Sequence, residues 1–213
     1  VINAAEKGSD LQLSGTTSGV EAGQTITVIF GGKSYTTTVA ADNTWGLTVP
    51  AADLTALPDG AANVQASVSN VAGNIVQTTH AYSVDATAPS VTINTIATDD
   101  ILNAAEAGTA LTISGTSTAE AGQTVTVTLN GVNYSGNIQA DGSWSISVPT
   151  GDLANLTASS YTVNAAVSDK AGNPASATHN LTVDLAAPVV TINTVAGDDI
   201  INATEHAQAQ IIS

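Results

Sequence analysis

The sequence has no cysteine and no arginine, and only 3% of its residues are aromatic. Without cysteine, disulfides and thiolate metal sites are excluded. Three lysines face 18 acidic residues, for a formal net charge of −15. Nucleic acid and anionic membrane surfaces are therefore disfavoured as partners, because phosphate binding depends on Lys and Arg. No apolar run reaches about 18 residues, so we predict no membrane insertion.

Hydrophobic residues make up 43% of the chain, and Val, Ile, Leu and Ala dominate them. Together with abundant Thr, Ser and Gly, this composition favours strands joined by turns. The acidic excess destabilises a compact state by self-repulsion unless cations gather on the chain. The sequence thus indicates a folded all-β protein that needs positive counter-charge.

The chain repeats itself at an offset of 99 residues. "DNTWGLTVPAADL" (42–54) matches "DGSWSISVPTGDL" (141–153), and the "VDATAP" and "VDLAAP" segments mark the boundaries. We expect a repeat lacking its first strand at 1–87, a complete repeat at 88–186 and the start of a third at 187–213. This organisation is typical of an excerpt from a longer array.

Apolar and polar residues alternate within the complete repeat. Trp144, Ile146 and Val148 are separated by serines, and turn signals such as "NG" and "DG" divide the segments. A period of two with one polar face predicts half-buried antiparallel strands. The fold we predict is all-β, with tandem immunoglobulin-like sandwiches arranged end to end. Helix is confined to turns in "NAAEAG" and "GDLANL".

One acidic motif, "DDxxNxxE", occurs at 99–106 and again at 198–205, and the first repeat contains its second half, "NAAE", at 3–6. Oxygen ligands of this kind suit Ca²⁺, which takes six to eight oxygens. If the segment coils helically, the first Asp, the Asn and the Glu share one face. A capping box, in which the Asn caps a short helix and the Glu reaches back, explains "NAAE" but not the two preceding carboxylates. The two roles are compatible.

The order of strands in such a sandwich places the motif at the pole where the last strand ends, which we call the C-terminal pole. We predict that metal ligands converge there, next to loops of the following domain. At the first junction the predicted ligands are Asn3, Glu6 and Asp85. At the second they are Asp99, Asp100, Asn103, Glu106 and Asp184. The third copy of the motif supplies Asp198, Asp199, Asn202 and Glu205. Weaker candidates from the facing loops are Glu120, Asp141 and Asp169, which also fit ordinary turns.

Other residues carry little functional signal. His80, His179 and His206 have no partner pattern, so a strand surface is expected rather than a metal site. Trp45 and Trp144 fit core packing better than a sugar platform. Asp53 and Asp152 fit helix caps. No serine has the context of a catalytic nucleophile, and we predict that the chain is not an enzyme.

Together, "DDIINATE", "SGTSTAEAGQTVTVTLNG" and "VSDKAGNPASATHNLTVD" resemble the bacterial Ig-like repeats of giant, type I-secreted, Bap-like adhesins of biofilms. The resemblance covers essentially the whole chain. It implies Ca²⁺ at domain junctions, secretion to the bacterial cell surface and a stalk that carries a binding tip outward. The partners it implies are neighbouring repeats of the same chain and, through the parent protein, host surfaces or other bacteria.

Two functional hypotheses follow. The first is a structural stalk segment that functions in cell adhesion and biofilm formation, with Ca²⁺ holding neighbouring domains rigid. The alternative is an Ig-like binding module that itself recognises a host glycan or a neighbouring adhesin. An exposed aromatic or apolar patch would distinguish the second, and the low aromatic content speaks against it.

Overall fold

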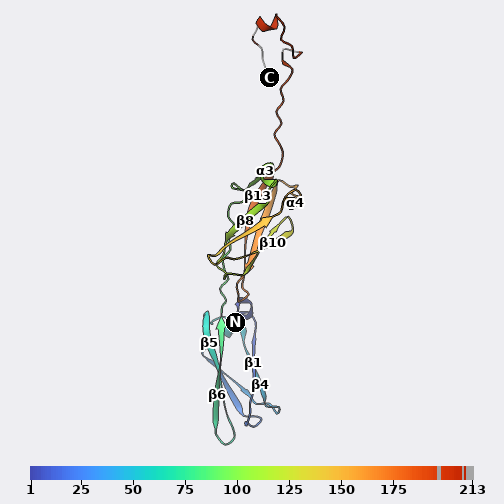
Figure 1. The fold of residues 1–213 in the computed structure, drawn as a ribbon. Coiled ribbons are helices and arrows are strands. Elements are labelled where there is room, and N and C mark those ends of the chain that lie inside the picture. The colour runs from blue at the N-terminus through green and yellow to red at the C-terminus, as the bar shows by residue number, and fades with distance from the viewer. Residues whose placement is uncertain (196–197, 208, 210–213) are drawn as a thin grey trace.

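A computed structural model of the chain describes residues 1–195, 198–207 and 209. Figure 1 shows two β-sandwiches stacked end to end, with an extended segment leading away from the second. The N-terminus lies where the two sandwiches meet (Figure 1). In the described part of the chain, no helix is long and apolar enough to cross a membrane. The predicted all-β sandwich fold is confirmed.

The first domain pairs a two-stranded sheet, β1–β4, with a four-stranded sheet in the order β3-β2-β5-β6. All of these pairings are antiparallel. The strands are β1 (Leu11–Thr16), β2 (Thr25–Phe30), β3 (Lys33–Thr38), β4 (Thr44–Val49), β5 (Gly60–Ser69) and β6 (Ile75–Val84). Two single-turn helices, α1 (Ala4–Lys7) and α2 (Ala51–Leu54), precede β1 and follow β4.

The second domain repeats this plan and adds a short strand. Its sheets are β8–β11 and β10-β9-β12-β13-β7, with β7 parallel to β13. The strands are β7 (Ile101–Asn103), β8 (Leu111–Thr116), β9 (Thr124–Leu129), β10 (Val132–Asn137), β11 (Ser143–Val148), β12 (Ser160–Ser168) and β13 (Pro174–Asp184). The helices are α3 (Ala104–Ala107) and α4 (Thr150–Leu153), at the two places where turns of helix were predicted.

Local sequence explains the tight hairpins. Asn130 and Gly131 join β9 to β10 with φ angles of 51° and 77°. A two-residue turn with positive φ at both positions matches the twist of the strands, and Asn-Gly suits it. Gly31 and Gly32 take the same place in the first domain, with φ of 56° and 78°.

The prediction that Asp53 and Asp152 cap helices was wrong. Pro50 and Pro149 occupy the cap positions and make no side-chain cap bond. The two aspartates instead accept hydrogen bonds from the hydroxyls of Tyr35 (2.7 Å) and Tyr134 (2.8 Å). Burial, followed by the bond to the carboxylate, raises the pKa of each tyrosine to about 12.

The two domains differ in their cores. In the second, one continuous cluster includes Val91 and Ile96, which lie ahead of β7, and the fully buried Trp144. In the first, the buried residues form two smaller clusters, and Trp45 is only half-buried. Core packing of the tryptophan is thus confirmed for Trp144, whereas Trp45 sits at the edge of its core.

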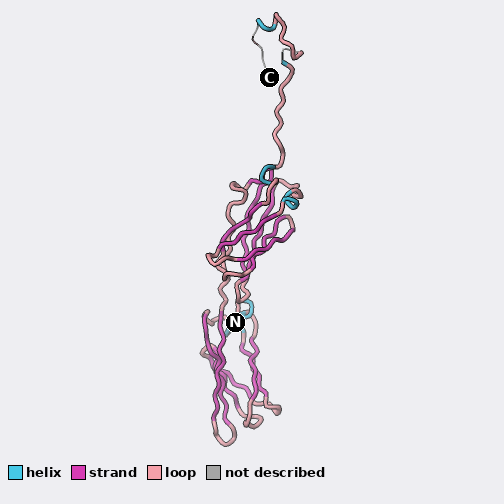
Figure 2. The backbone as a smooth tube through the Cα atoms, in the orientation of Figure 1, coloured by secondary structure: helices cyan, strands magenta, loops and turns pink. Residues whose placement is uncertain are grey.

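Beyond Asp184 the chain is extended (Figure 2). Residues 186–194 form no strand or helix, and residues 205–207 form a short 3-10 helix. The apolar side chains of Val189, Val190 and Ile192 in this segment are exposed to solvent.

Candidate functional site

The two aspartates of the motif shape a tight turn in the second domain. Asp99 Oδ1 accepts a hydrogen bond from the Ile101 amide (3.0 Å), and Asp100 Oδ1 accepts one from the Ile96 amide (2.7 Å). The Asp100 amide in turn donates to the Ile96 carbonyl (2.7 Å), with φ of 65° at Asp100. Both carboxylates therefore have a role in the backbone turn, which the sequence pattern did not indicate.

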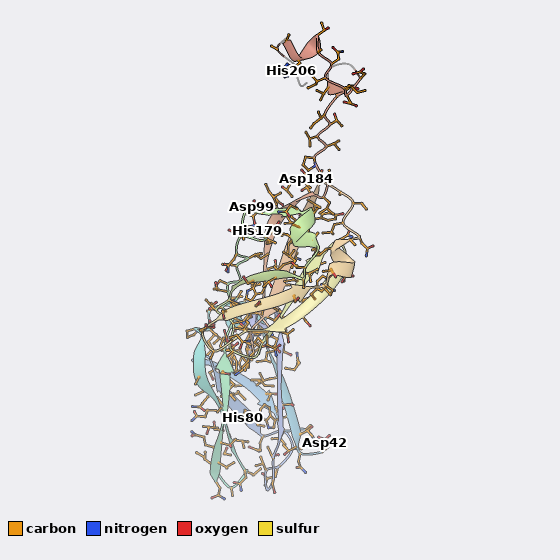
Figure 3. The ribbon with its side chains drawn as sticks, turned by 45° about the horizontal axis from the view of Figure 1, so that its top comes forward. Asp42, His80, Asp99, His179, Asp184 and His206 are labelled. Atoms are coloured by element: carbon orange, nitrogen blue, oxygen red, sulfur yellow. The ribbon has the colours of Figure 1, made fainter. Side chains whose placement is uncertain are left out.

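Asp100 also contacts the last strand of its domain. His179 Nε2 on β13 lies 2.7 Å from Asp100 Oδ1. Figure 3 shows His179, Asp99 and Asp184 at the same end of the domain. Two hydrogen bonds lower the pKa of Asp100 below its ordinary value. The bond from the Ile96 amide contributes most, and the bond with His179 comes second. This pair was missed because the aspartate and the histidine are far apart in sequence.

Asn103 and Glu106 form the expected capping box. Asn103 Oδ1 accepts from the Glu106 amide (3.0 Å), and Glu106 Oε2 accepts from the Asn103 amide (3.1 Å). Asn3 and Glu6 repeat the arrangement at α1, with both distances 2.9 Å. The capping interpretation is confirmed, and a cation role for the same side chains remains a prediction.

The motif is not one continuous coil, because β7 separates the paired aspartates from α3. The expectation that Asp99 shares a helical face with Asn103 was therefore wrong. Asp184 lies opposite Asn103 in the pairing of β13 with β7, so both residues are at the C-terminal pole. Within the described residues, no three His, Asp or Glu side chains are grouped closely enough to hold a metal.

The third copy of the motif repeats the turn. Asp198 Oδ1 accepts from the Ile200 amide (3.0 Å), and Asp199 Oδ1 accepts from the Val195 amide (2.9 Å). Asn202 Oδ1 accepts from the Thr204 amide (3.0 Å). Glu205 belongs to the short helix there, and its side chain lies outside the described part of the structure.

The junction between the two domains is held by Asn173, in the loop that joins β12 to β13. Asn173 is 1% exposed. Its Oδ1 accepts from the Ala4 amide (2.8 Å), and its Nδ2 donates to the Asp85 carbonyl (2.9 Å). One amide side chain thus satisfies a donor and an acceptor of the neighbouring domain.

The capping residue of α1 reaches across the same junction. Asn3 Nδ2 donates to the Ala171 carbonyl (2.9 Å), while its Oδ1 accepts from the Glu6 amide. The motif of the first domain therefore contacts the loop of the second through direct hydrogen bonds.

Asp169 holds Asn173 in place. Its Oδ1 accepts from the Asn173 amide (2.8 Å) and its Oδ2 from Asn173 Nδ2 (2.9 Å). Burial alone would raise the pKa of Asp169, but the hydrogen bonds from the side chain and amide of Asn173, and from the amides of Gly172 and Ala171, lower it overall. Both oxygens are engaged, so the structure gives Asp169 a positioning role.

A groove of about 460 Å³ lies at this junction and brings carboxylates of both domains together. Asp59 and Asp85 line it from the first domain, and Glu120 and Lys170 line it from the second. Glu120 Oε2 accepts from the Lys170 amide (3.0 Å). The side chain of Asp85 accepts no hydrogen bond from any residue that the structure describes.

Asp59 also secures the linker. Its Oδ1 accepts from the Ala86 amide (3.0 Å) and its Oδ2 from the Thr87 hydroxyl (2.6 Å). These bonds lower the pKa of Asp59, and the bond from the Thr87 hydroxyl contributes most. Neither Asp59 nor Asn173 was among the predicted site residues, although Asp169, in the same loop as Asn173, was a weaker candidate. Their roles depend on which loop faces which linker, and that is settled only in three dimensions.

Asp141 lies in the turn between β10 and β11. Its Oδ1 accepts hydrogen bonds from the amide (3.0 Å) and the hydroxyl (2.6 Å) of Ser143. Both bonds lower the pKa of Asp141, and the bond from the hydroxyl contributes most. Among the hydrogen bonds of the described residues, none joins Asp141 to the first domain. Its counterpart Asp42 lies at the end of the first domain away from the junction (Figure 3).

The comparisons with known proteins agree with this architecture. A family model for the bacterial Ig-like domain matches residues 88–185. A solved structure of a Ca²⁺-stabilised, ice-binding adhesin of an Antarctic bacterium is 37% identical, with a TM-score of 0.58. The match covers 99% of this chain and 53% of that one. No curated protein sequence matches the chain.

A second structure comes from a study of how a 1.5-MDa bacterial ice-binding adhesin is retained on its host cell surface. It is 33% identical, with a TM-score of 0.54, over 99% of this chain and 70% of that one. The chain belongs to the bacterial Ig-like domain family. As a bacterial Ig-like tandem it is similar to repeat domains of large adhesins, and it spans about half the length of the first of these structures.

Proposed function

We propose that this bacterial Ig-like tandem is a stalk segment of a cell-surface adhesin, secreted by a type I system and active in biofilm formation. Its junctions would bind Ca²⁺ and be made rigid by it. The observation that carries the proposal is the junction groove, where Asp59, Asp85 and Glu120 from two domains line one space. A stalk requires neighbouring domains to keep a fixed angle, and a cation bound in this groove would contact both domains.

The residues at the junction fit a hard cation chemically. Their donors are carboxylate, amide and carbonyl oxygens, which Ca²⁺ prefers, and the chain has no sulfur ligand. When bound, the cation would neutralise carboxylates that otherwise repel each other. Asp85 and Glu120 would hold it from the two sides, while Asn3 and Asn173 fix the separation of the domains.

The second C-terminal pole carries the same residue types. Asp99, Asp100, Asn103, Glu106 and Asp184 lie there, beside the segment that leads to the third repeat. Several of their oxygens already bond to backbone amides. We propose that ligand binding at this pole needs the loops of a docked third domain, just as Glu120 comes from the second domain at the first junction.

Calcium titration of the chain, with calorimetry and small-angle scattering, tests the proposal. Ca²⁺ at a hundredfold excess over its Kd should stabilise the docked state by about 2.7 kcal/mol. EDTA should lower the Tm and widen the range of interdomain angles. Glu120→Gln should weaken binding. Glu21→Gln is the matched control, because Glu21 bonds to Val71 in the equivalent loop of the first domain, away from the junction. The proposal that Ca²⁺ stiffens the junctions would be ruled out if EDTA changed neither the Tm nor the range of interdomain angles.

A further inference from the structure

Two of the chain's three lysines lie at the junction of the two domains, and the chain has no arginine. Lys170 lines the junction groove from the second domain, beside Glu120. In α1 of the first domain, Lys7 Nζ donates a hydrogen bond to the Leu57 carbonyl (2.6 Å), close to Asp59. Hydrogen bonds from the linker lower the pKa of Asp59 most, and the charge of Lys7 lowers it further. In a chain with a net charge of −15, positive side chains thus meet carboxylates at this junction.

Neither lysine belongs to the common plan of the repeats. Val71 takes the place of Lys170 in the first domain, and Ala107 takes the place of Lys7 in the second. The C-terminal pole of the second domain therefore lacks the counterpart of Lys7. The two lysines distinguish the first junction from the rest of the repeat pattern.

An extra carboxylate occurs at the same junction. Asp59 lines the groove from the first domain, whereas its counterpart in the second domain is Ala158. The added acid and the added base of Lys170 therefore lie on the two facing sides of one junction. Opposite charges on facing surfaces favour docking and select the matching partner.

The ammonium group of Lys170 is not fixed by a close partner. The backbone amide of this residue donates to Glu120 Oε2 (3.0 Å) and so ties the loop to the second domain. The side chain is exposed and, among the described residues, forms no ion pair. A lysine ammonium is a point charge on a flexible stem of four carbons. It is therefore free to move between the carboxylates of Asp59, Asp85 and Glu120, which line the same groove.

We propose that Lys170 is a tethered cation of the first junction. It offsets the repulsion among Asp59, Asp85 and Glu120 and so lowers the dependence of this junction on bound Ca²⁺. The ammonium carries a single charge and only donors, whereas Ca²⁺ carries two charges and needs six to eight oxygens. Both cations draw on the same carboxylates. Lys170 therefore stabilises the docked domains when Ca²⁺ is absent and weakens Ca²⁺ binding when it is present.

The part of the inference that concerns Ca²⁺ binding rests on the proposed function. The attraction of Lys170 to the carboxylates of the first domain does not, because it requires no bound ion. The two parts are therefore measured separately, one in EDTA and one in a calcium titration.

Lys170→Gln removes the charge and keeps a polar side chain. In EDTA, small-angle scattering should show a wider range of interdomain angles for this variant than for the unaltered chain. In calorimetric titration with Ca²⁺ alone, its affinity should be higher by roughly threefold to tenfold, because a like charge has left the groove. Lys170→Arg keeps the charge and should match the unaltered chain in both measurements.

Lys33→Gln is the matched control, because it changes the net charge by the same amount. Lys33 pairs with Asp53 and is not among the residues that line the junction groove. This variant should leave the interdomain angles and the Ca²⁺ affinity unchanged. The α-amino group of Val1 also belongs to a residue that lines the groove. Every chain is therefore acetylated there, so that Lys170 is the only cation among the described residues lining it.

The tethered cation would be overturned if Lys170→Gln and the unaltered chain had the same range of angles in EDTA. Equal Ca²⁺ affinities of these two chains would also overturn it, as would a Lys33→Gln variant that behaved like Lys170→Gln. A failure of the calcium site gives a different result. No chain would then bind Ca²⁺, while Lys170→Gln would still widen the range of angles in EDTA, which supports the tethered cation.

Discussion

The two domains follow one plan, yet one is closed and the other open. The second buries a continuous core under residues 90–96, while the first splits its core in two around a groove. The strand pairings β2–β3, β2–β5 and β5–β6 have direct counterparts in β9–β10, β9–β12 and β12–β13. The difference shows how much residues 90–96 contribute to the second core, because Val91 and Ile96 of this segment are buried in it.

The largest expected effect comes from truncating a core residue in the closed domain. Ile113→Ala should lower the free energy of unfolding of the second domain by about 2–5 kcal/mol, since Ile113 is fully buried. The matched Leu13→Ala should cost the first domain roughly half as much, because Leu13 already lines the groove. Urea denaturation followed by tryptophan fluorescence measures both.

Each domain contains one of the two tryptophans, so the domains can be followed separately. Trp45→Phe leaves Trp144 as the reporter of the second domain, and Trp144→Phe leaves Trp45 as that of the first. Equal losses of unfolding free energy for Ile113→Ala and Leu13→Ala would show that the first core is as tightly packed as the second. That result would contradict the greater exposure of the Leu13 side chain.

Much of this comparison is visible in the sequence. The repeat of 99 residues and the alternation in segments such as Trp144–Val148 predict the strands, because a period of two follows directly from strand geometry. The depth of the groove in the first domain does not follow from the pattern, because it depends on how both sheets relax.

The candidate site was less predictable. Asn3 and Glu6 form the cap that "NAAE" indicates, because capping is local in sequence. Asn173, which makes the closest contacts across the junction, is separated from Asp85 by 88 positions. Its role depends on the angle between two domains, and no periodicity encodes that angle. Sequence reasoning therefore found the pole but not the residue that joins the domains there.

A smaller effect, on the docking of the two domains, is expected from a substitution in the junction loop of the second domain. Asn173→Ala removes both junction bonds of this side chain and leaves the Ala4 amide and Asp85 carbonyl unpaired. Docking should weaken by about 1–3 kcal/mol. Small-angle scattering should show a wider range of interdomain angles, and hydrogen exchange at the Ala4 amide should accelerate.

The control for Asn173 is Asn74, its counterpart in the loop between β5 and β6. Asn74 is exposed, and the backbone bonds of its loop stay within the first domain. Asn74→Ala should leave the scattering profile and the Ala4 exchange rate unchanged. If the two variants behaved alike, the contacts of Asn173 would contribute nothing to docking.

The smallest effect should be a loss of the hydrogen bonds that hold the first linker as the pH falls. Asp59 binds the Ala86 amide and the Thr87 hydroxyl, and these bonds lower its pKa below the ordinary value of 3.8. A group whose pKa is lower in the folded state stabilises that state fully above its unfolded pKa. The contribution is lost as the pH falls through the lowered value. The first linker should therefore loosen only below about pH 3.8.

The second linker provides the contrast, since Ala158 and Ala186 replace Asp59 and Thr87 and this interaction has no counterpart there. NMR titration from pH 6 to pH 2 should show the Ala86 amide inflecting at the lowered pKa of Asp59. The amide of Leu185, the counterpart of Ala86, should show no such inflection. In Asp59→Ala the inflection at Ala86 should vanish while the Asn173 contacts persist. If it remained, another carboxylate would be responsible, and the two linkers would differ for a reason other than Asp59.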